Sequence, residues 1–149
     1  GSGRGVALTA RTGSLMGDYE LEGFMTRPVH WGGPERDILQ LVHPHPELRG
    51  ARPLGTSGLC EGGTLEDASK CVTEGQGSSL SFRFFVGKVR WGPGELDKEL
   101  ASGHWFPVRC SAGFVLDESE SIQAPPLWSE LAQAVGGTPE LVGRSFDLL

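Results

Sequence analysis

The histidines of this sequence are the side chains best suited to bind a metal ion, and two of them lie close together. His43 and His45 flank Pro44, while His30 and His104 are distant in the chain. Known metal sites combine such histidines with cysteines or carboxylates at fixed spacings, and none of those spacings occurs here. The proline more simply marks the end of a strand. The sequence therefore predicts no metal site and no cofactor.

Cysteine is the second residue type that could carry chemistry. The chain has three cysteines, Cys60, Cys71 and Cys110, at unrelated spacings. An odd number in a chain of 149 residues favours reduced thiols over a disulfide framework. The alternative is a redox-sensing thiol at Cys110, where the neighbouring Arg109 would favour the thiolate.

A pair of carboxylates could serve acid and base chemistry. Glu95 and Glu99 are four residues apart and would share one face of a helix. Acidic residues are also favoured in the first turn of any helix, and Glu95 can pair with Lys98 on the surface. The sequence favours this structural role, and only a raised carboxyl pKa in a cleft would support catalysis.

Two glycine turns could hold an anion on their free backbone N–H groups. They are Gly32-Gly33-Pro34 and Gly92-Pro93-Gly94. Pro93 lacks an N–H group, and neither turn matches a phosphate-binding loop. The chain also has no Gly-x-Ser-x-Gly elbow. The turns are best explained as structural, and we predict no catalytic residue.

The net charge limits the classes of partner that the protein can bind. It is −6, which repels a nucleic-acid backbone and disfavours general nucleic-acid binding. A local exception would be a basic patch of Arg83, Lys88 and Arg90, which would bind RNA in a salt-sensitive way. No apolar window is long enough to span a membrane.

One strand and one helix must position most of these residues. Residues 80–90 form the strongest strand, with Phe82 and Phe84 on one face and Phe85 on the other. Apolar side chains on both faces predict a central position in a sheet. A helix begins at Pro93 and ends at Gly103.

The remaining pattern predicts shorter elements joined by many turns, since the chain contains 23 glycines and 10 prolines. Further strands are expected at residues 6–9, 28–31, 38–43, 59–60, 105–108 and 112–116. Helices are expected at residues 15–24, from Thr64 to near Gly75, and at 127–135. Residues 11–14 are expected as a turn and 44–57 as a loop. The mixture predicts one α+β domain.

Several pieces in a fixed order resemble the YqgE/AlgH family. They are Trp31-Gly32-Gly33-Pro34, Gly58-Leu59, Gly62-Gly63, Leu65-Glu66, Phe82 to Gly87, Trp91, Glu95-Leu96, Glu99, Gly103 and Trp105. The resemblance implies an α+β fold with a bifurcated mixed sheet, including a small barrel-like part, surrounded by short helices. It implies no assigned activity. One departure is Lys88-Val89-Arg90, where relatives tend to have Tyr-Ala-Gly.

The resemblance also implies domain limits and a location. Residues 5–137 would form an AlgH-like domain without the N-terminal part of the family domain, and 138–149 a C-terminal tail. Residues 1–3 look like a remnant of cloning. Residues 82–111 are most similar to plant and algal members, which implies a chloroplast protein, although no targeting segment is visible in the chain.

The predicted function is a non-enzymatic protein-interaction or regulatory module that binds a protein partner or itself. It would use an exposed sheet edge or the region from Lys88 to Trp105. The alternative is an enzyme that binds a small molecule or nucleotide between residues 31–34 and 91–95. The candidate binding residues are Trp31, Gly32, Gly33, Pro34, Lys88, Arg90, Trp91, Gly92, Glu95, Glu99 and Trp105.

Overall fold

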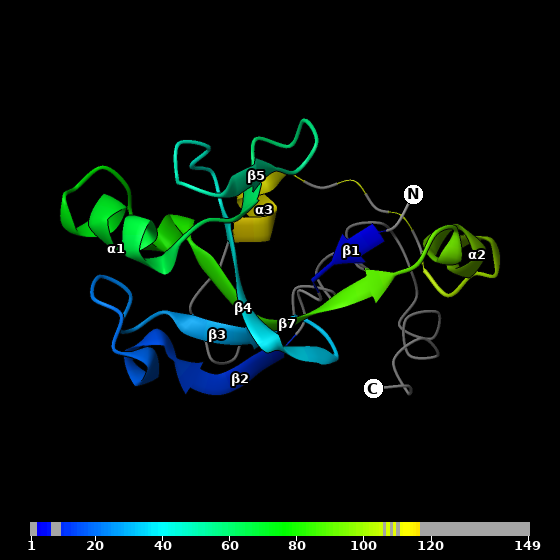
Figure 1. Cartoon of the computed structure of the whole chain (residues 1–149), viewed down its shortest axis with the longest axis horizontal. Helices are drawn as coiled ribbons and strands as arrows, with labels where there is room; N and C mark the ends of the chain where they lie inside the picture. Colours follow the sequence, from blue (N-terminus) through cyan, green and yellow to red (C-terminus); the bar gives the residue numbers. More distant parts are fainter. Residues whose placement is uncertain (1–2, 7–9, 106, 108, 110, 117–149) are drawn as a thin grey trace.

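A mixed β-sheet organises the chain in the computed structural model, which describes residues 3–6, 10–105, 107, 109 and 111–116 (Figure 1). The strands are β1 (Gly3–Gly5), β2 (Ala10–Leu15), β3 (Pro28–Trp31), β4 (Glu35–His43), β5 (Ala51–Pro53), β6 (Cys60–Gly62) and β7 (Arg83–Trp91). They follow the order β2-β3-β7-β4-β6-β5, and β1 pairs with β7 outside this path. β3 and β7 are parallel, and the other pairs are antiparallel. The α+β prediction is confirmed.

β7 is the central strand, as its aromatic pattern predicted. It pairs with three strands, β4, β3 and β1. β3 pairs with the first half, where Val29 lies opposite Phe84, and β1 pairs with the second half, where Gly5 lies opposite Val89. Gly87 lies at the change of partner and has a φ of +85°. The sheet therefore divides at Gly87.

Two apolar clusters cover the two faces of β7. One contains Phe82 and Phe84, and the other contains Phe85, so the predicted alternation is confirmed. The buried members of the first cluster are Met16, Phe24, Val29, Leu41, Leu48, Ala68, Cys71, Phe82 and Phe84. The second cluster combines Val42, Leu59 and Phe85. Burial on both faces explains the run of consecutive apolar residues Phe84, Phe85 and Val86 in this strand.

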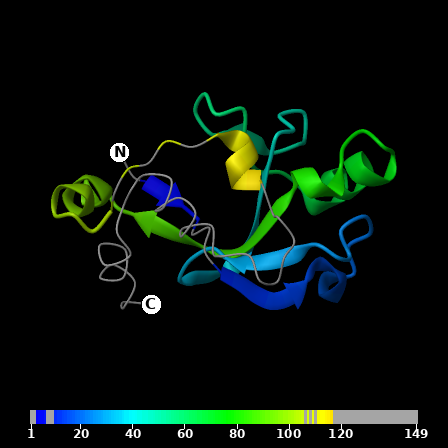
Figure 2. The ribbon, with the colours of Figure 1, turned by 180° about the vertical axis from the view of Figure 1, so that it is seen from behind.

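Short helices flank the sheet. They are α1 (Leu65–Thr73), α2 (Glu95–Ala101) and α3 (Ala112–Leu116), with 3-10 turns at η1 (Met16–Tyr19) and η2 (Ser79–Ser81). Thr64 caps α1, since its hydroxyl accepts the Asp67 N–H at 3.2 Å, as the sequence predicted. Figure 2 shows α1 and α2 at opposite ends of the molecule. Among the described residues, no helix is long and apolar enough to cross a bilayer.

Two expectations near the start of the chain were wrong. Residues 11–14 belong to strand β2 rather than to a turn, because a register shift absorbs Gly13, whose φ is +88°. The expected helix at residues 15–24 is reduced to η1, which ends where Glu20 adopts a φ of 55°. Gly17 within η1 and Gly23 after it are poor helix formers, so too little helix-forming sequence remains to extend the turn.

Three expectations further along the chain also changed. Residues 112–116 form helix α3 rather than a strand, because their apolar side chains pack against the cluster around Phe85. In residues 105–108, the described residues Trp105 and Pro107 are not in a strand. The loop 44–57 contains strand β5, and the expected strand at residues 59–60 begins one residue later, as β6. The expected helix at residues 127–135 lies outside the described residues.

Candidate functional site

Five of the predicted site residues gather where β7 ends and α2 begins. The carboxylate of Glu99 accepts hydrogen bonds from the indole N–H groups of Trp91, at 2.9 Å, and of Trp105. The two indole rings meet edge to face, with centroids 5.8 Å apart. The hydrogen bond from Trp105 is the main cause that lowers the pKa of Glu99 below its ordinary value, and the bond from Trp91 is the second cause. Glu99 is therefore an ionised acceptor that fixes two tryptophans, which disfavours an acid role.

Glu95 faces the start of its own helix. Its carboxylate accepts the Gly92 N–H at 2.6 Å, and Gly92 has no side chain that would obstruct this contact. The backbone N–H group that an anion would need at this turn is therefore already bound. This contact supports the structural explanation of the Gly92-Pro93-Gly94 turn and disfavours an anion site there.

The turn after β3 crosses closely over β7. The Gly32 N–H donates to the Val86 carbonyl at 2.8 Å. A Cβ atom on Gly32 would lie 2.2 Å from the Gly87 carbonyl oxygen, and one on Gly33 would lie 2.3 Å from the Lys88 carbonyl carbon. Both glycines are thus required by the close approach of two backbones. Trp31, just before them, carries the guanidinium of Arg36 over its ring at 4.6 Å.

Glu35 connects the two predicted cations and was not among the predicted site residues. Its carboxylate lies 3.2 Å from the Arg90 guanidinium and 3.8 Å from the Lys88 ammonium. Lys88 is buried, as is Arg83, whose guanidinium donates to the Val115 carbonyl at 2.5 Å. Since two of the three cations are buried, these residues do not present the basic patch that local RNA binding would need.

The predicted residues therefore form two groups. Trp91, Gly92, Glu95, Glu99 and Trp105 lie at the end of β7, and residues 31–34 lie over its bend, where Glu35 joins Lys88 and Arg90. The groups share β7 as a common support. A cavity of about 100 Å³ lies nearby and is lined by Arg4, Gly5, Val6, Gln40, Val42, Leu54, Glu61 and Lys88. Ligand pockets usually measure about 300–1,000 Å³, so this cavity is too small for a nucleotide.

His30 of strand β3 is held as a buried, neutral imidazole. Burial lowers its pKa to about 4, the positive charge of Arg83 adds to this effect, and a hydrogen bond to the Phe84 carbonyl opposes it. The unfolded chain binds a proton near pH 6.5 and the folded chain only near pH 4. The stability that neutral His30 provides is thus complete above pH 6.5 and is lost as the pH falls towards 4.

Replacing His30 should flatten this pH dependence. We expect His30→Gln to remove about 2–3 kcal/mol of the stability loss between pH 7 and pH 4, measured by urea unfolding at each pH. The matched control is His104→Gln, which removes an exposed histidine and keeps the buried His30. Equal profiles of stability against pH for His30→Gln and the wild type would contradict the neutral state assigned to His30.

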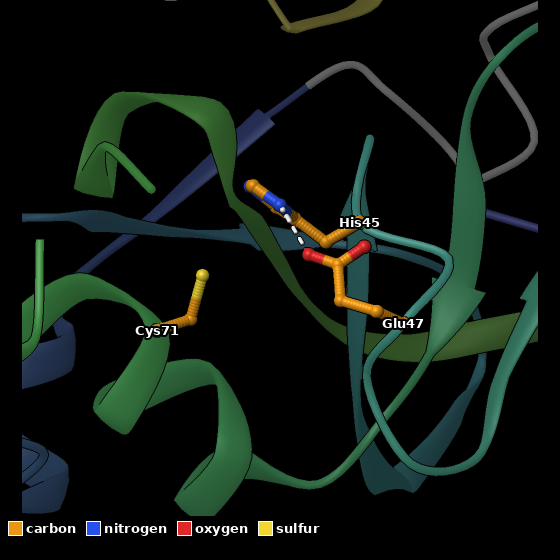
Figure 3. A group of neighbouring side chains, drawn as sticks. All are labelled: His45, Glu47 and Cys71. Carbon is orange, nitrogen blue, oxygen red and sulfur yellow. Dashed lines mark hydrogen bonds and ion pairs between the residues drawn. The ribbon is translucent and has the colours of Figure 1, made fainter. Parts of the chain in front are cut away.

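A separate group of polar side chains combines two parts of the chain. His45 and Glu47 follow β4, and Cys71 lies on α1; Figure 3 shows the three side chains directed toward one another. One ligand atom from each lies within 4.8 Å of the others. Burial raises the pKa of Cys71, and the charges of Glu47 and Glu74 raise it further. The sequence pointed to His45 as a possible ligand but not to this group, because the position of Cys71 relative to His45 matches no metal-binding pattern.

Comparison with known proteins gives one family. The family model described as AlgH-like, DUF179, matches residues 5–140. The chain is 29% identical over 136 residues to a UPF0301 protein of Chlorobaculum tepidum, covering 84% of this chain and 70% of that protein. It is 26% identical over 122 residues to a UPF0301 protein of Chlorobium luteolum, covering 81% of this chain and 62% of that protein. The chain thus spans roughly two thirds of the length of these bacterial relatives.

A solved structure supports the same fold. The solution structure of the AlgH protein from Pseudomonas aeruginosa superposes with a TM-score of 0.69 at 18% identity. The match covers 95% of this chain and 77% of that chain. At this identity the likeness establishes the arrangement of the sheet and helices.

Proposed function

This chain belongs to the AlgH-like family DUF179, a family of unknown function. We propose that it is a protein-interaction module that binds a second copy of itself through strand β2. The observation that carries the proposal is an apolar patch beside the end strand of the sheet. The patch consists of Leu15, Tyr19 and Met25, which are 44%, 49% and 61% exposed.

β2 is suited to pairing with another chain. It is the terminal strand of the sheet, and among the described residues only β3 pairs with it. The other edge of such a strand offers backbone N–H and C=O groups to an added strand. Pairing of two copies of β2 would extend the sheet across a two-fold axis.

The apolar patch adjoins this edge. The segment after η1 folds back, since the Gly17 N–H donates to the Met25 carbonyl at 2.9 Å. Met25 is thereby held beside η1, which carries Tyr19 and follows Leu15 directly. Exposed apolar side chains next to an open strand are typical of a contact surface.

The charges near the two ends of β2 favour a second copy of the chain as the binding partner at this edge. Arg11 near the start of β2 is exposed, and so is Asp18, which follows its end. Antiparallel pairing of two copies would bring the start of each strand toward the end of the other. Arg11 of one copy would then approach Asp18 of its partner, and these opposite charges would set the register.

Self-association can be measured directly by sedimentation equilibrium. We expect the double variant Leu15→Glu, Met25→Glu to raise the dissociation constant of the dimer at least about tenfold, because four carboxylates would enter an apolar contact. The matched control is Leu80→Glu, which places a carboxylate at an apolar residue that is 60% exposed in η2. The control should associate as the wild type does.

Two results would overturn the proposal. One is a wild-type chain that stays monomeric up to about 100 µM, where a contact weaker than roughly −5.5 kcal/mol would no longer be seen. The other is a double variant that dimerises as tightly as the wild type. Thermal unfolding of all three proteins distinguishes loss of contact from loss of fold.

The other finer predictions stay proposals. No observation among the described residues specifically favours the enzyme alternative, since the Glu99 carboxylate and the Gly92 N–H are engaged within the chain. A regulatory role would follow from partner binding. The plant or algal origin, the shortened N-terminal part and the chloroplast location rest on the resemblance alone. Fluorescence microscopy of the tagged full-length protein would test the location.

A further inference from the structure

We propose that His45, Glu47 and Cys71 bind a zinc ion. Together they offer an imidazole nitrogen, a carboxylate oxygen and a sulfur, all within 4.8 Å of one another. Nitrogen, oxygen and sulfur are the ligand atoms that zinc uses in proteins. The inference is independent of the proposed self-association, because the three residues lie outside β2 and the Leu15, Tyr19 and Met25 patch.

The spacing of the ligand atoms is close to that of a tetrahedral site. His45 Nδ1 and Glu47 Oε1 are 3.1 Å apart. Two ligands bonded to one zinc ion at 2.0–2.3 Å in tetrahedral geometry lie about 3.3–3.8 Å apart. Small side-chain movements therefore suffice to place all three atoms around one ion, and Figure 3 shows the Cys71 sulfur directed toward the imidazole.

The imidazole is already oriented by its surroundings. Its second nitrogen, Nε2, lies 3.0 Å from the Ser81 hydroxyl, which itself donates to the Ser78 carbonyl. The ring stacks on Phe82 with centroids 4.9 Å apart and 13° between planes. A hydrogen bond from Nε2 to a neighbouring oxygen is the usual way in which a protein fixes a histidine ligand through Nδ1.

The backbone around the histidine is fixed as well. The His45 N–H donates to Nδ1 of His43 at 3.1 Å, and Nε2 of His43 lies 2.8 Å from the Gly62 carbonyl. His43 is fully buried, and its burial lowers its pKa, so it is a neutral structural residue. The two histidines that the sequence places together thus have different roles, and His43 is not a ligand.

The group is open to solvent on one side. The Glu47 side chain is 61% exposed and that of His45 14% exposed, while Cys71 is buried. Gly77 lies against the group, and a Cβ atom there would lie 2.8 Å from the Cys71 sulfur and 3.0 Å from His45 Nε2. A side chain at residue 77 would therefore collide with both groups, whereas Glu47 lies on the side that is open to solvent.

The chemistry of binding is balanced without an oxidant. Zinc would displace two protons, that of the Cys71 thiol and that on His45 Nδ1 in its hydrogen bond to Glu47, and both pass to solvent. One zinc–sulfur bond, one zinc–nitrogen bond and one zinc–oxygen bond form in their place. Three protein ligands leave a fourth position for water, as in zinc sites that act on substrates.

Cobalt(II), a stand-in for zinc that absorbs visible light, tests the site in the full chain. We expect one equivalent of cobalt to give tetrahedral d–d bands and a sulfur-to-cobalt charge-transfer band, and zinc to abolish both. Cys71→Ser should remove the charge-transfer band, whereas Cys60→Ser should retain it, since Cys60 is an equally buried free cysteine on β6. Cys110→Ser serves as a second cysteine control.

A second variant keeps the test decisive if Cys71→Ser does not fold. Glu47 is largely exposed, so Glu47→Gln should fold normally yet weaken zinc binding at least about tenfold in competition with a chromophoric chelator. Absence of the charge-transfer band in the wild type overturns the proposal. So does a band that persists in Cys71→Ser, or unchanged zinc affinity in Glu47→Gln. Magnesium, which prefers oxygen ligands, should not compete.

Discussion

Gly87→Ala is expected to lower the free energy of unfolding by about 2–5 kcal/mol, a large share of the 5–15 kcal/mol that stabilises a typical domain. The φ of Gly87 is +85°, a conformation that costs an L residue roughly 1–2 kcal/mol. A Cβ atom would also lie 2.4 Å from the Gly33 carbonyl oxygen and 2.9 Å from that of Glu35. Because both obstacles are backbone atoms, neither can rotate away.

The effect follows from the position of Gly87 at the division of the sheet. Here β7 pairs with β3 before Gly87 and with β1 after it, and the turn after β3 crosses the strand. To admit a methyl group, this crossing would have to open. The hydrogen bond from Gly32 to Val86 would then weaken with it.

Gly94→Ala is the matched control for this substitution. Gly94 also has a positive φ, +74°, but a Cβ atom there would meet no atom within 4 Å. This variant should lose only the conformational part, about 1 kcal/mol. Urea unfolding of both variants separates strain from steric overlap, and equal midpoints would show that the crossing at Gly87 is looser than described.

Phe24→Ala is expected to cost about 3–5 kcal/mol, because it would leave a cavity in the main core. Phe24 is fully buried and meets Phe82 and Phe84 edge to face, with ring centroids 5.1 Å and 4.9 Å away. Such aromatic pairs add about 0.5–1.5 kcal/mol to the gain from burial. The residue connects the loop after η1 to the central strand.

The next residue in the chain is the control. Met25 is 61% exposed, so at a protein concentration too low for the proposed self-association, Met25→Ala should change the unfolding free energy by no more than about 0.5 kcal/mol. Chemical unfolding measured by tryptophan fluorescence reports both variants. If Phe24→Ala were as mild as Met25→Ala, the loop would have to be attached to the core by other contacts.

Much of the fold could be predicted from patterns among neighbouring residues. The aromatic alternation around Phe84 predicted a central strand, and Thr64 before an apolar run predicted the start of α1. The grouping of motifs also pointed to the family, which the match over residues 5–140 establishes. The predictions were wrong where the local preference for helix or strand was weak. The five residues of α3 suit either a strand or a helix, and their packing against the cluster around Phe85 favours the helix.

The same distinction between local patterns and contacts of distant segments applies to the candidate sites. The contact of Glu99 with Trp91 lies within eight residues, so the sequence could select both members, although it could not show their hydrogen bond. Cys71 and His45 meet only because α1 packs beside the end of β4. Side-chain alternation and capping act over a few neighbouring residues, so the strand β7, the helices that follow glycine or threonine signals, and the family could all be identified from the order of the amino acids. The edge at β2, the role of Glu35 and the His45, Glu47 and Cys71 group became apparent in the folded chain alone, because they depend on which distant segments bury their apolar faces together.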